Sequence, residues 1–183
     1  MSSFPVPDSP VIRTVVGWRA ALRARSIASR MAALWPMKRF PLLVDGERTV
    51  LEASCIIEYL QLHYPGPVRL IPADPDTALD VRMLDRFFDN YVSTPQQKFV
   101  ADKLRPEGAN RDPHGVEEAR AMLERSYGCL EQRMADGEWA AGNPFSLPDC
   151  GAAPFLFYPD WTHPIDARYP NVRAYRQRLL ARP

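Results

Sequence analysis

Two short apolar runs, both containing β-branched residues, flank an Asp-Gly pair near the end of the first third of the chain. Residues 41–44 come before Asp45 and Gly46, and residues 49–51 come after them. An Asp-Gly pair accepts the positive φ angles of a two-residue hairpin turn. The pattern therefore predicts two antiparallel strands joined by a tight turn.

A helical period begins directly after this hairpin. Between Glu52 and Tyr64 the apolar and aromatic positions recur every three or four residues, and Pro65 and Gly66 then end the pattern. This spacing places one apolar stripe along a helix, with Ile56, Tyr59, Leu60 and His63 on it. The hairpin is thus expected to lead straight into a helix.

Residues 64–77 are rich in proline and show no sustained period, as expected of a connection between two packing units. Beyond them every legible period is helical. One stripe passes through Leu84, Phe88 and Tyr91, and a longer one steps by threes and fours from Val116 to Met134. The sequence predicts a first domain over 1–66, a linker over 67–77 and an all-α domain over 78–183.

A helix-start signature stands at Ser146. Pro148 lies in the first turn of the expected helix, and Asp149 stands three residues after the serine, where its carboxylate can accept a hydrogen bond from the cap backbone. The helix is expected to continue to Tyr158, and a final amphipathic helix follows through Val172, Tyr175, Leu179 and Leu180.

The first forty residues carry weaker signals. Residues 4–7 can form at most a short edge strand because two of them are prolines. Ser9 and Pro10 form a good helix start, as N-cap and first helical residue, for a helix to Arg25. A second short helical run over 26–34 leads to Trp35, and no β-branched run separates the two.

Composition and charge exclude several classes of protein. The chain has 183 residues, 46% of them hydrophobic, and 23 basic residues balance 22 acidic ones, so no net field favours nucleic acid or an anionic membrane. It has no 18-residue apolar stretch and no secretory signal, which indicates a cytoplasmic protein. The three cysteines lack a CxxC spacing and the three histidines lack a neighbouring second ligand, so no metal site is expected.

Three segments, in this order, resemble the cytosolic glutathione transferase family. Residues 35–46 are similar to its "NPxGKVPxLxDG" segment, residues 52–60 to its "ESxxIxxYL" segment, and residues 145–150 to its "FTLADxxxxP" box. The resemblance implies an α/β plus all-α fold, with a thioredoxin-like N-terminal domain that is possibly incomplete and an all-helical glutathione transferase C-terminal domain. It also implies glutathione as co-substrate, a small hydrophobic electrophile as second substrate, and a homodimer.

The resemblance also implies roles for individual residues in binding glutathione. A cis Phe40-Pro41 bond would present the Phe40 backbone to the cysteinyl part of the tripeptide, as an added strand does. Glu52 would bind the γ-glutamyl ammonium group, and the N–H groups of Ala53 and Ser54 at a helix N-terminus would bind its carboxylate. Arg39 would pair with the glycyl carboxylate.

For catalysis, Ser9 matches the position of the catalytic Ser or Cys in several classes of the family. Its hydroxyl would donate to the glutathione sulfur, and the helix dipole would favour the thiolate. The electrophile would lie against an apolar wall in the helical domain, formed by Phe88, Tyr91, Phe157 and Tyr158.

Each of these residues also has an ordinary structural interpretation. Ser9 can be a plain N-cap, Glu52 an acid that complements a helix dipole, Arg39 a solvated loop charge, and the four aromatic residues can pack in the core.

The chain also departs from the family pattern, because Ala53 stands where the family has a serine, the first domain is short by about a strand, and a C-terminal helix is missing. A non-catalytic binding or regulatory protein of the same fold is therefore the alternative hypothesis. A thiol-disulfide oxidoreductase is disfavoured, since position 9 is not a cysteine.

Overall fold

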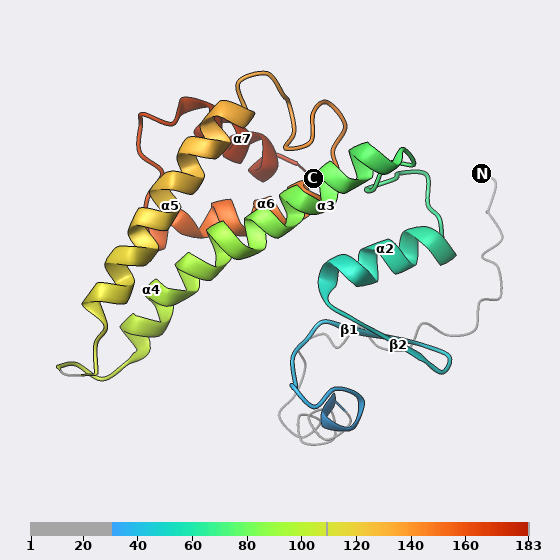
Figure 1. The fold of residues 1–183 in the computed structure, drawn as a ribbon, viewed down its shortest axis with the longest axis horizontal. Helices are drawn as coiled ribbons and strands as arrows, with labels where there is room; N and C mark the ends of the chain where they lie inside the picture. Colours follow the sequence, from blue (N-terminus) through green and yellow to red (C-terminus); the bar gives the residue numbers. More distant parts are fainter. Residues whose placement is uncertain (1–30, 109, 183) are drawn as a thin grey trace, which may run out of the picture. The chain divides into compact units, whose positions relative to one another are not determined.

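The computed structural model describes residues 31–108 and 110–182, and the chain divides into two compact units, Met1–Gly66 and Pro67–Pro183 (Figure 1). The expectations for Ser9, for the edge strand over 4–7 and for the helix to Arg25 fall outside the described residues. Of the short helical run over 26–34, residues 31–34 are described and are helical.

The predicted hairpin and helix are present in the first unit. Strand β1 (Leu42–Asp45) pairs antiparallel with β2 (Arg48–Leu51), and Gly46 takes the positive φ of 59° that the turn requires. Helix α2 (Ala53–His63) follows after a single residue, Glu52. Among the described residues these two strands form the whole sheet.

A carboxylate at the hairpin turn ties the sheet to α2. Asp45 accepts hydrogen bonds from the hydroxyl of Tyr59 at 2.7 Å and from that of Tyr64 at 2.6 Å. The bond from Tyr64, followed by the one from Tyr59, lowers the pKa of Asp45, so the carboxylate stays ionised and keeps both partners. The guanidinium of Arg48 lies 5.7 Å from the Tyr59 ring centre on the same side of the hairpin.

The described part of the second unit is helical. Its elements are α3 (Pro75–Phe87), the π-helix η1 (Phe88–Ser93), α4 (Thr94–Leu104), α5 (Pro113–Arg133), α6 (Leu147–Phe157), the 3-10 turn η2 (Tyr158–Trp161) and α7 (Pro170–Leu180). Helix α4 packs on α5, α3 packs on α6, and α7 packs on both α5 and α6. None of the helices described is both long and apolar enough to cross a bilayer.

The core of this unit is built around the stripe that the sequence indicated on α5. Leu123, Tyr127 and Leu130 are buried with residues from four neighbouring elements, η1, α4, α6 and α7, among them Phe88, Leu156 and Tyr175. Burial of the Tyr127 hydroxyl raises the pKa of this tyrosine, which keeps the group neutral in the core.

The predicted helix start at Ser146 forms a capping box around a fully buried acid. The Asp149 carboxylate accepts from the backbone N–H of Ser146 at 2.8 Å and of Ala140 at 2.9 Å, and from the Tyr175 hydroxyl at 2.6 Å. A buried charge is tolerated only with such a set of donors. Asp149 thus joins the start of α6, the loop before it and α7.

Two prolines have no backbone N–H to donate to the carbonyl group four residues earlier. A buried side chain donates a hydrogen bond to each of these carbonyl groups instead. Pro95 has no N–H for the Tyr91 carbonyl, which accepts from Ser126 Oγ at 2.8 Å instead. Pro159 likewise has none for the Phe155 carbonyl, and Gln96 Nε2 donates to it at 2.7 Å. These bonds fix α5 and α4 to the irregular turns beside them.

Three details differ from the sequence-based expectations. Helix α3 begins at Pro75, inside the segment expected to be linker, with Asp74 as its N-cap. Residues 88–93 continue the helical segment as a π-helix, in which Phe88, Val92 and Ser93 are buried and Tyr91 is exposed. The expected helix over 147–158 ends at Phe157, and a 3-10 turn follows it.

Candidate functional site

The expected binding residues of the first unit meet at one end of the hairpin. Leu42, the first residue of β1, pairs with Leu51, the last residue of β2. The residue before β1 and the residue after β2 are therefore opposite each other at this end of the hairpin. Pro41 therefore lies across from Glu52, and the Phe40-Pro41 bond is cis, as the resemblance implied. The register brings residues 40–41 and residues 52–54 together, although twelve positions separate Phe40 from Glu52.

Glu52 has an unusual backbone conformation. Its φ is 66° and its ψ is 132°, in the region that residues other than glycine rarely adopt. Its side chain is exposed and makes no cap hydrogen bond to α2. The carboxylate thus makes no cap bond to the helix and lies at the positive end of its dipole, where Ala53 and Ser54 begin α2.

The other expected residues of this end are mostly exposed. The Phe40 side chain is 80% exposed, Arg39 and Pro41 are exposed, and Ser54 is partly buried. Lys38 also has a positive φ of 53°, so the approach to the cis bond is a tight, irregular turn. The candidate site is therefore a surface edge that combines the acid Glu52, the bases Lys38 and Arg39 and a helix N-terminus.

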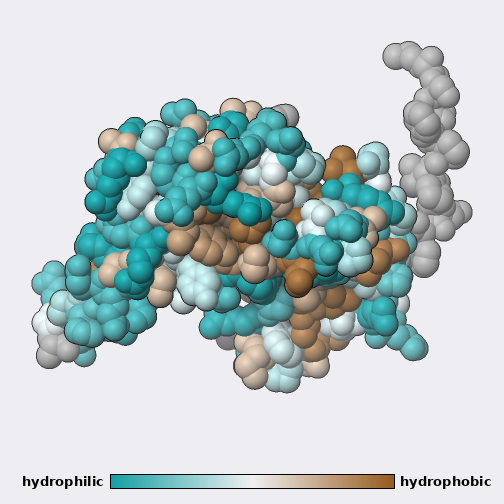
Figure 2. Space-filling model, turned by 45° about the horizontal axis from the view of Figure 1, so that its top comes forward, coloured by the Kyte–Doolittle hydropathy of each residue, from teal (hydrophilic) through white to brown (hydrophobic). Residues whose placement is uncertain are grey.

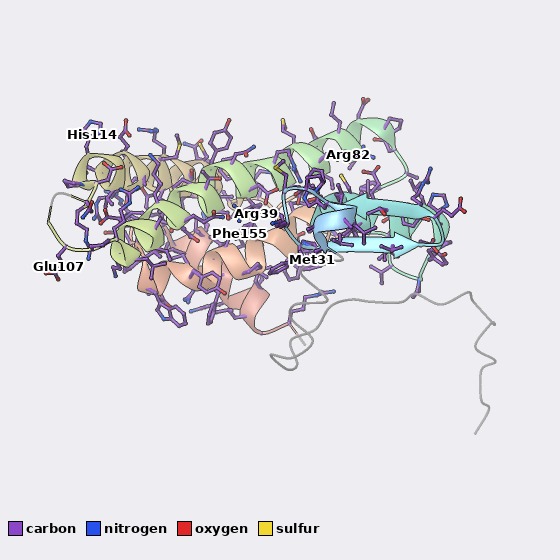
Figure 3. All side chains as sticks on the ribbon, turned by 90° about the horizontal axis from the view of Figure 1, so that it is seen from below. Met31, Arg39, Arg82, Glu107, His114 and Phe155 are labelled. Carbon is purple, nitrogen blue, oxygen red and sulfur yellow. The ribbon has the colours of Figure 1, made fainter. Side chains whose placement is uncertain are left out.

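The second unit has an apolar groove with a volume of about 840 Å³ between α4 and the segment formed by α6 and η2. Its apolar lining consists of Phe99, Val100, Ala101, Leu104, Phe155, Tyr158 and Trp161. Phe155, labelled in Figure 3, comes from α6, and Trp161, which is 67% exposed, comes from η2. Figure 2 shows apolar side chains gathered in patches on a predominantly hydrophilic surface.

Phe99, in one wall of the groove, contacts a polar cluster formed by His163 and by two residues of α5, Arg120 and Glu124. The Phe99 ring stacks on the His163 ring at a centroid distance of 6.1 Å, and the Arg120 guanidinium lies 5.6 Å from the same Phe99 centroid. His163 Nε2 bonds to Glu124 Oε1 at 2.5 Å, and Arg120 Nη1 lies 3.1 Å from His163 Nδ1.

Of the four aromatic residues expected to form the substrate wall, only Tyr158 lines this groove. Phe88 has no exposed surface and packs in the core, so the expectation that it lines a pocket is corrected. Tyr91 and Phe157 are 47% and 41% exposed but are not part of the lining, although the Phe157 ring contacts the rings of Tyr158 and Trp161. Phe88 follows Val81 and Asp85 at the three- and four-residue spacing of the buried helix face, so its side chain points into the core.

Sequence reasoning missed most of the groove lining. Phe99, Val100 and Leu104 lie on α4, and Phe155 and Trp161 lie on either side of Tyr158. The spacing of Phe155, Tyr158 and Trp161 by three residues was the signal that could have identified this wall. Among the described residues there is no group of His, Cys, Asp and Glu suited to a metal ion.

The chain, with a hairpin and helix in one unit and a helical second unit that contains a buried capping box, has the glutathione transferase fold by its similarity to solved structures. The model of the "Glutathione S-transferase, C-terminal domain" family matches residues 113–178. A glutathione S-transferase structure from Methylobacterium radiotolerans, in complex with glutathione sulfonate, is 30% identical with a TM-score of 0.68 and covers 81% of this chain and 70% of that one.

Two further relatives agree with this class. A glutathione S-transferase structure from Methylobacillus flagellatus with glutathione bound is 25% identical, has a TM-score of 0.74 and covers 83% of this chain and 76% of that one. A probable maleylacetoacetate isomerase from Vibrio cholerae is 27% identical over 150 residues, 81% of this chain and 69% of the relative. The chain belongs to the glutathione S-transferase family.

Proposed function

We propose that this chain is a glutathione transferase that binds the tripeptide at the hairpin end and joins its thiol to a small hydrophobic electrophile. The observation that carries the proposal is the convergence of Phe40-Pro41 and Glu52–Ser54 at that end. Two relatives whose structures hold glutathione or glutathione sulfonate support the ligand.

The γ-glutamyl part of glutathione carries both an ammonium and a carboxylate group, and the two require opposite partners. The exposed Glu52 carboxylate would pair with the ammonium. The N–H groups of Ala53 and Ser54, at the positive end of the eleven-residue helix α2, would bind the carboxylate. The strained backbone of Glu52 supports this role because it holds the acid beside the helix N-terminus without capping it.

The remainder of the tripeptide would extend along the edge before β1. Its cysteinyl amide would pair with the Phe40 backbone, as a strand added to a sheet edge does. Arg39, exposed one residue earlier, would pair with the glycyl carboxylate. Both ends of the tripeptide would then be anchored, which fixes the position of the sulfur between them.

The reaction requires a thiolate. We propose that Ser9 donates a hydrogen bond to the sulfur and so lowers the pKa of the thiol, whose proton passes to solvent. With an aryl halide, the sulfur forms a C–S bond at the carbon bearing the halogen. The C–halogen bond then breaks, and the halide leaves with its electron pair. The apolar groove between α4 and η2 would hold the aromatic ring of the electrophile.

We further infer a cytoplasmic homodimer. The three cysteines are free thiols in the structure, which fits a reducing compartment. Leu79 and Met83 expose apolar side chains one turn apart on α3, a surface that a second copy could cover. Sedimentation equilibrium should give twice the monomer mass of 20.8 kDa, and a monomer at micromolar concentration would refute this part of the proposal.

The function is tested by conjugation of glutathione to 1-chloro-2,4-dinitrobenzene, followed by absorbance of the thioether, together with retention on immobilised glutathione. The Ser9→Ala variant should keep retention and lose most of the turnover. Retention without any turnover by the natural chain would favour the alternative, a non-catalytic glutathione-binding protein, for which Ala53 in place of the family serine is the sequence argument.

A second enzymatic candidate comes from two relatives, from Vibrio cholerae and mouse, that are named maleylacetoacetate isomerases. An isomerase would convert a cis double bond of an unsaturated dicarboxylic acid to trans without consuming glutathione. Turnover of such a substrate with unchanged thiol concentration, and no thioether from the aryl halide, would favour isomerisation over conjugation.

A further inference from the structure

The walls of the groove in the second unit are aromatic, but its hydrogen-bonding groups are largely engaged with the protein. Gln96 donates to the Phe155 carbonyl at 2.7 Å and Gln97 to Ser93 Oγ at 3.2 Å. Thr162 Oγ1 donates to the Tyr158 carbonyl at 3.2 Å. A ligand therefore meets rings and aliphatic groups, with few polar partners.

Charge is distributed unevenly along α4 beside this groove. Lys103 is the single charged residue of the lining, which holds no carboxylate. The two neighbouring cations face elsewhere and are paired, Lys98 with Glu118 at 3.9 Å and Arg105 with Asp112 at 4.0 Å. Within the described ranges, 31–108 and 110–182, Lys103 forms no ion pair of this kind.

An apolar groove with one unpaired cation at its edge is complementary to a ligand with a flat apolar body and one negative charge. Rings of the ligand can stack on Phe155, Tyr158 and Trp161, and the charge can reach the ammonium at the end of its flexible stem. A dicarboxylic acid without an aromatic body would bury too little apolar surface, and a cation would be repelled.

We propose that this groove selects aromatic ligands that carry one acidic group, and that Lys103 is the residue that determines this specificity. The inference deepens the proposed function and rests on it in one respect, since the electrophile would occupy the same groove. Ligand binding itself needs no glutathione, so it can be tested separately from catalysis.

The binding experiment uses the full chain and two fluorescent probes that differ by one acidic group. 8-Anilino-1-naphthalenesulfonate has the aromatic body and the charge, whereas N-phenyl-1-naphthylamine has the body alone. Each is titrated without glutathione, with probe fluorescence and the quenching of Trp161 as readouts. The Trp161→Phe variant identifies the quenching that arises in the groove, since any quenching of the other three tryptophans remains in this variant.

We expect Lys103→Gln to weaken binding of the sulfonate about fivefold, the upper range for a partly exposed ion pair. Lys103→Arg keeps the charge and should restore the affinity, and neither change should alter binding of the neutral probe. The matched control is Lys98→Gln, on the same helix but outside the groove, which should leave both affinities unchanged.

Equal sulfonate affinity for the natural chain and Lys103→Gln would overturn the proposal, and so would an equal loss for the neutral probe or for Lys98→Gln. In a second experiment, turnover of 4-chloro-3,5-dinitrobenzoate is compared with that of its methyl ester, and the ratio of the two kcat/KM values, acid over ester, should fall in Lys103→Gln and be kept in Lys103→Arg. If neither halide reacts while the probe pattern holds, the proposed transferase activity fails and the specificity of the groove stands.

Discussion

Glu52 combines an exposed carboxylate with a backbone conformation that costs free energy. A residue other than glycine in such a region is destabilised by roughly 1–3 kcal/mol, and nothing in the hairpin itself requires an acid there. The combination is understandable if the carboxylate serves a ligand rather than the fold.

This interpretation predicts that stability and binding respond in opposite directions at position 52. Glu52→Gly should raise the free energy of unfolding by about 1 kcal/mol relative to Glu52→Gln, since relief of strain exceeds the entropy cost of glycine. Urea unfolding followed by circular dichroism gives the comparison. Both variants lose the charge, so a Gly variant no more stable than the Gln variant would refute stored strain.

Glu124 illustrates how neighbours set the charge of a half-buried acid. Burial by itself raises its pKa, but hydrogen bonds from His163, Arg168 and Tyr169 together hold the pKa below its usual value of 4.5. Because the folded chain favours the ionised form, Glu124 stabilises the fold above pH 4.5 and loses this effect as the pH falls.

The Glu124→Gln variant should therefore be less stable than the natural chain at pH 5, and the difference should shrink toward pH 3. Thermal unfolding at a series of pH values measures it, with Glu117→Gln as the control because Glu117 is exposed and pairs only with Arg120 among the residues described. Parallel stability curves for the natural chain and Glu124→Gln would contradict the assignment.

At the scale of elements, Asp149 is a fully buried acid that joins α6, the loop before it and α7. Asp149→Ala would leave the N–H groups of Ala140 and Ser146 and the Tyr175 hydroxyl buried without their acceptor. We expect a loss of about 3–5 kcal/mol in the free energy of unfolding. Asp160→Ala, which removes an exposed partner of Arg176, should cost less than about 1 kcal/mol.

Some secondary-structure elements could be predicted from the sequence and others could not. The hairpin, α2, α5 and the capping box of α6 follow from local signals: an Asp-Gly turn, a sustained period of 3.6 residues and a Ser-x-x-Asp box. The π-helix has no such signal, because its extra residue per turn is stabilised by distant groups such as Ser126 on the Tyr91 carbonyl.

The two candidate sites also differ in how far the sequence could predict them. The hairpin end could be anticipated residue by residue, since Phe40, Pro41 and Glu52 lie in contiguous motifs that a register brings together. The groove could not, because its lining comes from α4, α6 and η2, and a prediction of their packing needs tertiary information. The conformation of Glu52 was likewise not predictable from its residue type.

On the scale of the whole molecule, the chain passes from the first unit to the second within a short segment. Gly66 ends the first unit, yet only four residues later Leu70 accepts a hydrogen bond from the Leu147 N–H at 2.9 Å, and Ile71 is buried. Residues 70–71 therefore belong structurally to the helical unit, and the exposed residues 65–69 are the natural boundary.

Limited proteolysis of the full chain should accordingly yield a stable helical fragment that begins near residue 70. Trypsin has an exposed target at Arg69, and mass spectrometry of the products identifies the cut. A stable fragment that begins beyond Pro75, or rapid degradation of the helical unit after cleavage at Arg69, would contradict the assignment of residues 70–71 to that unit.

The central claim is that Glu52 and the N-terminus of α2 hold glutathione. Isothermal titration of glutathione into the full chain tests it most directly, with the Glu52→Gln variant beside the natural chain and Glu58→Gln, on the same helix, as the control. The account predicts about a tenfold weaker affinity for Glu52→Gln alone, as expected for loss of one charge-assisted hydrogen bond. Equal affinities for all three proteins, or no binding to the natural chain, would contradict it.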